Sequence, residues 1–210
     1  MLEVSPNRSD QDFEILDSYN VNWNLSLPFK KNEPWRVSQA YDERGGSHNG
    51  YTSFCFDFER SDLGSSEGVA LVSAARGRVA IVCEDSPAQG ERGNYINIKF
   101  QEGAFYGYLH IQQNSFRNFS FARVPQPHPG WLRPFVGIDQ EVARLGDTST
   151  PNNPHLHFGV SNIPDVTPGQ KLGLVTLPVA FSNYYGLEGN NWSYVPLGVP
   201  KSGEVIMRKS

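Results

Sequence analysis

Short runs of apolar residues, separated by clusters of Gly, Pro, Asp and Asn, recur along most of this chain. The runs are rich in Val, Ile, Phe and Tyr, which is typical of β-strands. No window shows apolar residues at helical spacing over about 11 residues or more. The runs that predict strands are 19–29, 35–41, 53–59, 69–85, 94–100, 104–111, 141–147 and 155–161. A close series of strands without helices predicts a mainly all-β fold, an antiparallel sheet or sandwich with long connecting loops.

The two ends of the chain differ from this middle part. Residues 1–33 are polar and weakly patterned, and we interpret them as an N-terminal extension or the remnant of a pro-segment. Residues 166–210 contain two more strand patterns, at 174–187 and 203–209, and we expect this β extension to pack on the same domain. Residues 34–165 are therefore predicted to form the main domain.

The long connection between two predicted strands, from Gln112 to Ile138, has an unusual composition. It holds four prolines, four phenylalanines and a tryptophan. A connection of this length inside a compact domain is usually functional or without fixed structure. Its aromatic residues indicate either a wall or lid over a binding site, or a cover packed on an edge of the core. The residues alone leave both interpretations open.

Composition and charge narrow the classes of partner. The chain has 210 residues, a formal net charge of −4 and a pI near 5.7, and its Lys and Arg residues are scattered. This pattern argues against a nucleic-acid partner. No apolar run reaches the about 18 residues of a membrane span, and the N-terminus lacks the basic and then apolar pattern of a secretory leader. The two cysteines, Cys55 and Cys83, are compatible with one disulfide or with two free thiols.

Four of the five histidines lie where strand patterns begin or end. His48 follows glycines in a loop that leads into the run containing Asp57, and His110 closes an aromatic run. His155 and His157 are two residues apart, so in a strand both imidazoles point to the same face. A catalytic zinc takes three protein ligands from His, Asp and Glu and keeps a fourth position for water. The loop histidine, the carboxylate and one histidine of the pair meet that requirement, but these residues alone do not say which member of the pair binds metal.

The order of these motifs resembles a known family. A glycine-rich loop with a histidine, an aspartate on the next strand, Tyr-x-His and then Pro-His-x-His follow one another as in the lysostaphin-type zinc endopeptidases. The resemblance extends from Trp35 to Asn162 and includes the segments "GVALVSAARGRVAIV", "GNYINIKF" and "VGIDQEVARLGDTSTPNNPHLHFGV". Several separated motifs in one order are more specific than any single histidine pair.

The resemblance implies a fold, a metal and the roles of five residues. The fold is the duplicated hybrid motif fold of these cell-wall peptidases, with the main domain as the catalytic domain. His48, Asp57 and His157 become the ligands of one zinc per chain. His110 and His155 become the two imidazoles beside the zinc-bound water, where they carry a proton or stabilise the developing oxyanion.

The resemblance also implies a substrate and a place of action. Members of the family cut peptide bonds in the cross-links or stem peptides of bacterial peptidoglycan. The chain would then act as a secreted or periplasmic protein of the cell envelope, with no leader visible in this sequence. The residues do not choose between a glycine bridge, a direct cross-link and a stem peptide.

Three features depart from the family pattern. Nine positions separate His48 from Asp57, where many members have four. Asn153 precedes Pro154 where Gly is common, and Gly159 stands where Glu is often found. None of these changes removes a ligand, so we expect them to alter the substrate cleft more than the chemistry.

Two other functions are compatible with the same residues. The first is a non-catalytic binding or regulatory module on the same fold, although such members characteristically lose ligands. The second is a structural zinc site in a β-sandwich binder, although structural zinc prefers four protein ligands and usually cysteine. Two further residues have open interpretations. Tyr41 either donates a hydrogen bond to the oxyanion or packs at a strand end, and His128 is interpreted as solvated or substrate-facing and not as a ligand.

Overall fold

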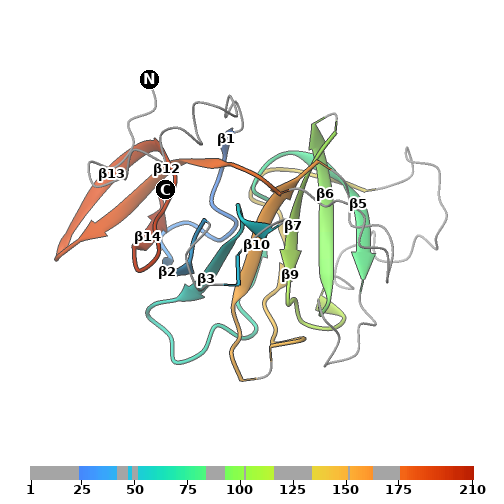
Figure 1. Cartoon of the computed structure of the whole chain (residues 1–210), viewed down its shortest axis with the longest axis horizontal. Helices are drawn as coiled ribbons and strands as arrows, with labels where there is room; N and C mark the ends of the chain where they lie inside the picture. The colour runs from blue at the N-terminus through green and yellow to red at the C-terminus, as the bar shows by residue number, and fades with distance from the viewer. Residues whose placement is uncertain are drawn as a thin grey trace.

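The computed structural model of the chain describes residues 24–41, 47–48, 52–83, 93–101, 103–115, 134–150, 152–162 and 176–210. Nearly all regular structure in these ranges is β-strand, and none of it is α-helix (Figure 1). No helix in the same ranges has the length and hydropathy needed to cross a membrane. The predicted fold class, mainly all-β with antiparallel sheets, is confirmed.

Most of the described strands join one large sheet. In chain order the strands are β1 (Asn24–Leu25), β2 (Pro34–Gln39), β3 (Phe56–Arg60), β4 (Ala70–Val72), β5 (Gly77–Cys83), β6 (Tyr95–Gln101), β7 (Ala104–Leu109), β8 (Phe135–Val136), β9 (Glu141–Arg144), β10 (Leu156–Ser161), β11 (Thr176–Leu177), β12 (Ala180–Glu188), β13 (Asn191–Gly198) and β14 (Val205–Arg208). The sheet order is β1-β12-β14-β2-β3-β10-β7-β6-β5-β8, with β11 on β10 and β13 on β12. The strands pair antiparallel except β1 with β12, and β4 pairs with β9 in a second sheet.

The strand predictions between residues 35 and 161 are confirmed, because every run contains a strand. The run 69–85 holds two strands that belong to different sheets, β4 and β5. The run 19–29 contains only the two-residue β1 within its described part. Two strands are not predicted by the pattern. β8 is two residues long, and β13 contains Pro196 and mostly exposed positions, which is why it lacks the alternation of a half-buried strand.

The core-facing and site-facing side chains of the central strand β3 alternate. Phe56 and Phe58 are fully buried and their rings stack at 5.5 Å between centroids. Both also contact Phe181 of β12, so the C-terminal strands share this core. Asp57, between the two phenylalanines, necessarily points to the opposite face of the sheet. The strong apolar positions on either side of Asp57 therefore fix the face on which its carboxylate stands.

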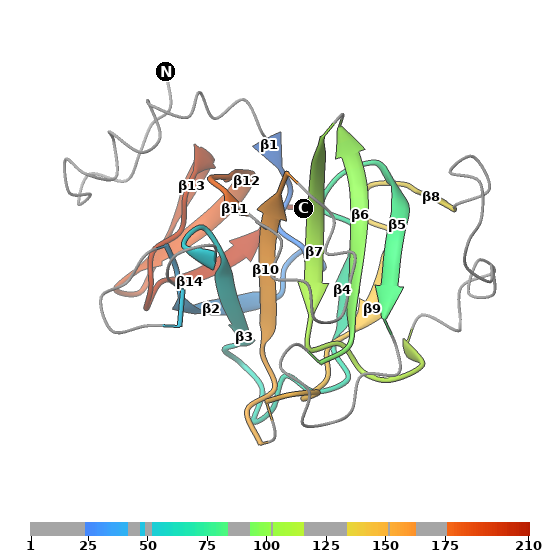
Figure 2. The same cartoon turned by 45° about the vertical axis from the view of Figure 1, so that its right-hand side comes forward.

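Buried tyrosines join β7 to the second sheet. The Tyr106 hydroxyl donates to the Ala75 carbonyl at 2.7 Å, and the Tyr108 hydroxyl donates to the Val72 carbonyl at 2.7 Å. The Ala74 amide donates in turn to the Tyr108 hydroxyl at 3.0 Å. Figure 2 shows the β4–β9 pair lying behind β6 and β5. These hydrogen bonds fix the position of β7, the strand that ends one residue before His110.

The described part of the segment 166–210, residues 176–210, contributes to the same sheet as the predicted main domain. β14 pairs with β2 and with β12, so the C-terminal strands extend the sheet beyond β3 (Figure 1). Whether the segments 1–33, 34–165 and 166–210 act as separate units stays a prediction.

Candidate metal centre

Asp57 and His157 are brought together by strand register. β10 pairs antiparallel with β3, and His157 lies directly opposite Asp57. Directly opposite residues of an antiparallel pair point to the same face. His157 Nδ1 lies 2.9 Å from Asp57 Oδ1. Two positions 100 residues apart in the chain thus meet because the sheet places them side by side.

His48 reaches the same point from the loop that follows β2. Its side chain is fully buried. Its Nδ1 lies 3.0 Å from the Ala40 carbonyl oxygen, and since a carbonyl only accepts, Nδ1 carries the proton and donates. This hydrogen bond fixes the tautomer of the imidazole and aims Nε2 at the other two side chains, as outer partners of metal-binding histidines do.

The three candidate ligand atoms form a compact triangle. His48 Nε2 lies 3.2 Å from Asp57 Oδ1 and 3.3 Å from His157 Nδ1, and the third side of the triangle is the 2.9 Å contact described above. Two ligand atoms that each lie about 2.0 Å from a tetrahedral zinc are separated by about 3.3 Å. The triangle therefore has the size of one face of a zinc tetrahedron. Two imidazoles and one carboxylate are also the ligands that a catalytic zinc takes.

Within the described residues, His48, Asp57 and His157 are the group of His, Cys, Asp and Glu side chains that can hold a metal ion. His128 lies outside the described residues. Cys55 and Cys83 are both free thiols, so the disulfide alternative does not apply. Burial, together with the negative charge of Asp57, raises the pKa of the Cys55 thiol far above its usual range, so this cysteine stays protonated at neutral pH.

The remaining two predicted site residues lie beside the triangle. His155 Nε2 is 3.8 Å from Asp57 Oδ1, so both members of the histidine pair point to the same side, as the spacing predicts. The His110 ring lies 4.8 Å from the His155 ring and 6.0 Å from the His157 ring, measured between centroids. The structure thus brings all five predicted residues into one cluster, while their division into ligands and catalytic residues stays a prediction.

Both of these imidazoles have one nitrogen engaged by the backbone. His155 Nδ1 donates to the Asn153 carbonyl at 2.9 Å, and His110 Nδ1 donates to the Thr148 carbonyl at 2.9 Å. In the neutral form of each ring, Nε2 therefore carries the lone pair. The Ser149 hydroxyl lies 2.9 Å from the same His110 nitrogen.

The loop at 146–149 is the part of the site that sequence reasoning missed. Besides the contact of its carbonyl with His110, Thr148 uses its hydroxyl twice. The hydroxyl accepts from the backbone N–H of Asn94 at 2.9 Å and donates to the Ile111 carbonyl at 3.1 Å. His110 itself has a φ of 61°, which an L-residue adopts rarely, so surrounding bonds must hold it in place. The segment that resembles the family includes Thr148, but the contact of Thr148 with His110 follows only from the fold.

Two pKa shifts describe the electrostatics of the cluster. Burial by itself would raise the pKa of Asp57, but the adjacent imidazoles of His157 and His48 outweigh burial and hold that pKa well below its usual range. Burial, and then the neighbouring His155 and His157, lower the pKa of His110 to about 4. At neutral pH the cluster therefore combines an ionised carboxylate, as a metal ligand requires, with a neutral imidazole at His110.

The hydroxyl of Tyr41 is engaged by the backbone of Val179. Its hydroxyl donates to the Val179 carbonyl at 2.5 Å and accepts from the Val179 amide at 2.6 Å. Its ring packs against Phe54 and Phe56. These contacts support the interpretation of Tyr41 as a packed aromatic that ties the loop before His48 to the C-terminal segment, and not as an oxyanion donor.

Gly159 stands two residues after His157, at a position where only a hydrogen fits. A Cβ built on Gly159 would lie 2.7 Å from Cys55 Sγ. Cys55 is itself buried, so the sulfur has little room to move away. The glycine, which departs from the family pattern, is thus explained by the buried thiol packed against it.

We expect Gly159→Ala to lower the free energy of unfolding by about 1–3 kcal/mol, because the added methyl overpacks the contact with Cys55. The cost should shrink in a Cys55→Ala background, where the sulfur is absent. Gly186→Ala is the matched strand control, since no atom lies within 4 Å of its Cβ position. Urea unfolding curves of the four variants measure the effect. An equal cost with and without the thiol would show that this contact does not select glycine.

Comparisons with known proteins gave matches to solved structures alone. No family model matches the chain, and no curated protein does. Similar solved structures include Csd3 from Helicobacter pylori, with 21% identity, 75% of this chain covered and a TM-score of 0.42. A zinc-containing peptidase from Vibrio cholerae has 22% identity over 64% of this chain, with a TM-score of 0.43. The M23 metalloprotease pseudoalterin, from the deep sea, has 15% identity over 83% of this chain, with a TM-score of 0.49.

The matched region covers very different shares of those proteins. It spans 37% of the Csd3 chain and 35% of the Vibrio cholerae chain, but 96% of the pseudoalterin chain. At these identities the comparisons describe a likeness of fold.

Proposed function

We propose that this chain is a zinc-dependent metallopeptidase, with His48, Asp57 and His157 as the ligands of one zinc ion. The observation that carries the proposal is the triangle of two imidazole nitrogens and one carboxylate oxygen, with sides of 2.9, 3.2 and 3.3 Å. The ligands come from a loop and two adjacent strands that the sheet holds rigidly, as precise metal sites require. The carboxylate is already ionised at neutral pH, so it can bind a cation without losing a proton.

More particularly, the proposed activity is endopeptidase cleavage of peptide bonds in the cross-links or stem peptides of bacterial peptidoglycan. Support comes from the order of the sequence motifs between Trp35 and Asn162, which resembles the lysostaphin-type enzymes. The proposed place of action is the cell envelope or the exterior, because the substrate lies there.

Zinc at this triangle would supply a Lewis acid that polarises the scissile carbonyl and lowers the pKa of water. The chain itself would supply proton transfer from His155 and His110. Each holds Nδ1 against a backbone carbonyl, so Nε2 can accept a proton and later deliver it to the leaving amine. The low pKa of His110 keeps that ring neutral at pH 7 and makes it a weak base, so His155 is the better candidate for carrying the proton between steps.

A non-catalytic binding or regulatory module remains the alternative function on this fold. It would need neither imidazole beside the triangle, whereas this chain keeps both, each with one nitrogen held by a backbone hydrogen bond. A structural zinc site would need a fourth protein ligand. The described cluster offers three, and Cys55 is a buried, protonated thiol.

We expect the zinc-loaded protein to release soluble peptide-containing fragments from purified sacculi. Sacculi with glycine bridges and sacculi with direct cross-links should be digested in parallel, and mass spectrometry of the fragments names the bond that is cut. Chelation of the metal should stop the release, and added zinc should restore it. Sacculi of both types that stay intact with one zinc bound per chain would favour the non-catalytic alternative.

A further inference from the structure

The hairpin formed by β12 and β13 carries an exposed aromatic surface. Trp192 and Tyr194 are 40% and 45% exposed, which is unusual for side chains of this size. They are two residues apart in β13 and therefore share one face. Leu187 lies opposite Trp192, and Tyr185 lies opposite Tyr194 with their ring centroids 5.8 Å apart. We call these four side chains the aromatic face.

The aromatic face lies on the same side of the sheet as the metal centre. Asp57 and Glu59 alternate in β3 and so share a face, and Glu59 lies opposite Arg36 of β2. Arg36 lies opposite Val205 of β14, and Val205 lies opposite Leu187. Directly opposite residues keep the same face at each step. The register shift between β2 and β3 begins beyond Arg36 and does not interrupt this path.

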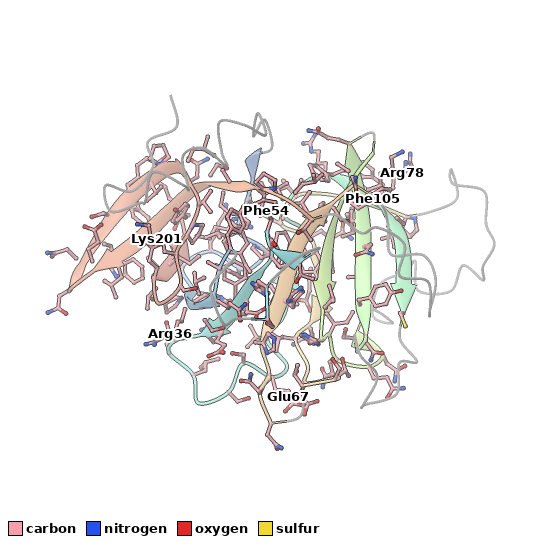
Figure 3. The ribbon with its side chains drawn as sticks, in the orientation of Figure 1. Arg36, Phe54, Glu67, Arg78, Phe105 and Lys201 are labelled. Carbon is pink, nitrogen blue, oxygen red and sulfur yellow. The ribbon has the colours of Figure 1, made fainter. Side chains whose placement is uncertain are left out.

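Burial supports the same assignment. On the opposite face of these strands, Trp35, Phe58, Ile206 and Tyr184 are buried in the core. On the face shared with Asp57, Arg36 is exposed (labelled in Figure 3) and the side chains of β12 and β14 are only partly buried. Four strand spacings separate β3 from β13, which is about 19 Å. The aromatic face thus lies on the same side of the sheet as the candidate ligands.

Polar groups frame the exposed rings. The Tyr194 hydroxyl donates to Asn183 Oδ1 at 2.6 Å, and the Lys209 ammonium lies 4.1 Å from the centre of the Tyr194 ring. These contacts hold Tyr194 in a fixed orientation, while Trp192 beside it exposes its indole. Charged and amide groups around planar rings are unlike the apolar centre of a stable protein interface. They do suit a carbohydrate, which lays its C–H face on an aromatic ring and directs its hydroxyls to polar groups around that ring.

We propose that the aromatic face binds the glycan strand of peptidoglycan, with Trp192 as the stacking platform. This inference rests on the proposed function, because it is the glycan attached to the peptide at the metal centre that would reach β13. A peptide substrate and its glycan are covalently joined, so a second contact about 19 Å away on the same face would hold the polymer while the peptide is cut. The C-terminal strands would then add a polysaccharide contact to the peptidase sheet.

The test is binding of peptide-free glycan strands, released from sacculi by an amidase, to the full chain. We expect Trp192→Ala to weaken this binding about tenfold or more, since the lost stacking contact is the main one. Trp192→Phe should recover part of the affinity because it restores a ring. Ser193→Ala is the matched control, since Ser193 is an exposed residue on the other face of the same strand. This variant should bind the glycan as tightly as the unmodified chain does. Equal affinity of the Trp192→Ala and Ser193→Ala variants would overturn the proposal.

The two proposals fail in distinguishable ways. Glycan binding requires neither zinc nor cleavage, so it should persist in a His157→Ala variant that has lost its metal. Intact sacculi together with Trp192-dependent glycan binding would reject the peptidase and keep the glycan site. Digested sacculi with no glycan binding would keep the peptidase and reject the glycan site. Sedimentation of the same variants tests a second copy of the chain as the occupant, and a dimer that dissociates on Trp192→Ala without any glycan affinity in the parent would overturn the glycan assignment.

Discussion

His157→Ala is expected to abolish stoichiometric zinc binding. The chain should bind about one zinc, and the variant should lose affinity by at least about a hundredfold, because removal of one of three ligands exceeds the 10–100-fold cost of losing an outer partner. The variant also leaves Asp57 without its 2.9 Å partner and exposes the carboxylate to water. Zinc content after dialysis and competition titration with a chromophoric chelator measure the effect.

Thermal unfolding in the presence of zinc tests the same prediction without an activity assay, so the result does not depend on knowing the substrate. Zinc that binds only the folded chain raises its midpoint of thermal unfolding, and the rise grows with zinc concentration. We expect that dependence in the unmodified chain and in a His128→Ala variant, which removes a histidine predicted not to be a ligand. We expect no such dependence in His157→Ala. One zinc retained by His157→Ala at unchanged affinity would refute the ligand assignment.

The strands were predictable where one face of a strand is buried. In β3 the alternation of Phe56, Asp57 and Phe58 records both faces of the sheet, because the two rings enter the core and the carboxylate stands opposite. The same holds for the histidine pair, whose spacing of two gives a common face. β13 was not predictable in this way, since its positions are mostly exposed and it contains Pro196. A strand with few buried side chains carries little record of its neighbours in its pattern.

The composition of the site could be read from the sequence, but its assembly could not. The residues alone gave two imidazoles, a carboxylate and a zinc, while the choice of His157 over His155 came from a family resemblance. The geometry adds a physical reason for that choice: His157 lies directly opposite Asp57 in the register, whereas His155 precedes the strand and lies 3.8 Å from the carboxylate. Register between β3 and β10 is a property of the whole sheet, which is why no local pattern shows it.

The support of His110 could not be predicted for a similar reason. Thr148 and Ser149 lie almost 40 residues further along the chain and meet the imidazole through one backbone carbonyl and one hydroxyl. The sequence shows a turn there, with residues such as Asp147 that favour turns. That this turn holds the ring of a histidine with a positive φ follows only from the fold.

His155→Ala is expected to keep the zinc and to lose cleavage. Its ring lies outside the triangle of candidate ligands, with Nε2 3.8 Å from Asp57 Oδ1, so the metal should bind with nearly unchanged affinity. If His155 carries the proton, the rate of peptide release from sacculi should fall by about 10²–10⁴-fold. Zinc content and the release rate, measured on the same preparation, separate this outcome from loss of the ligand set.

The His110→Ala and double variants assign the two imidazoles. If both rings serve one proton transfer, the double variant should be little slower than His155→Ala, because residues that act as a unit are not additive. If His110 instead stabilises the oxyanion, the two losses should multiply. The pKa of about 4 for His110 disfavours the second outcome, because with Nδ1–H held by the Thr148 carbonyl the ring can donate through Nε2 only when it is protonated. Cleavage at the parent rate by zinc-loaded His155→Ala would exclude proton transfer through this ring and leave His110 as the sole candidate in the described cluster.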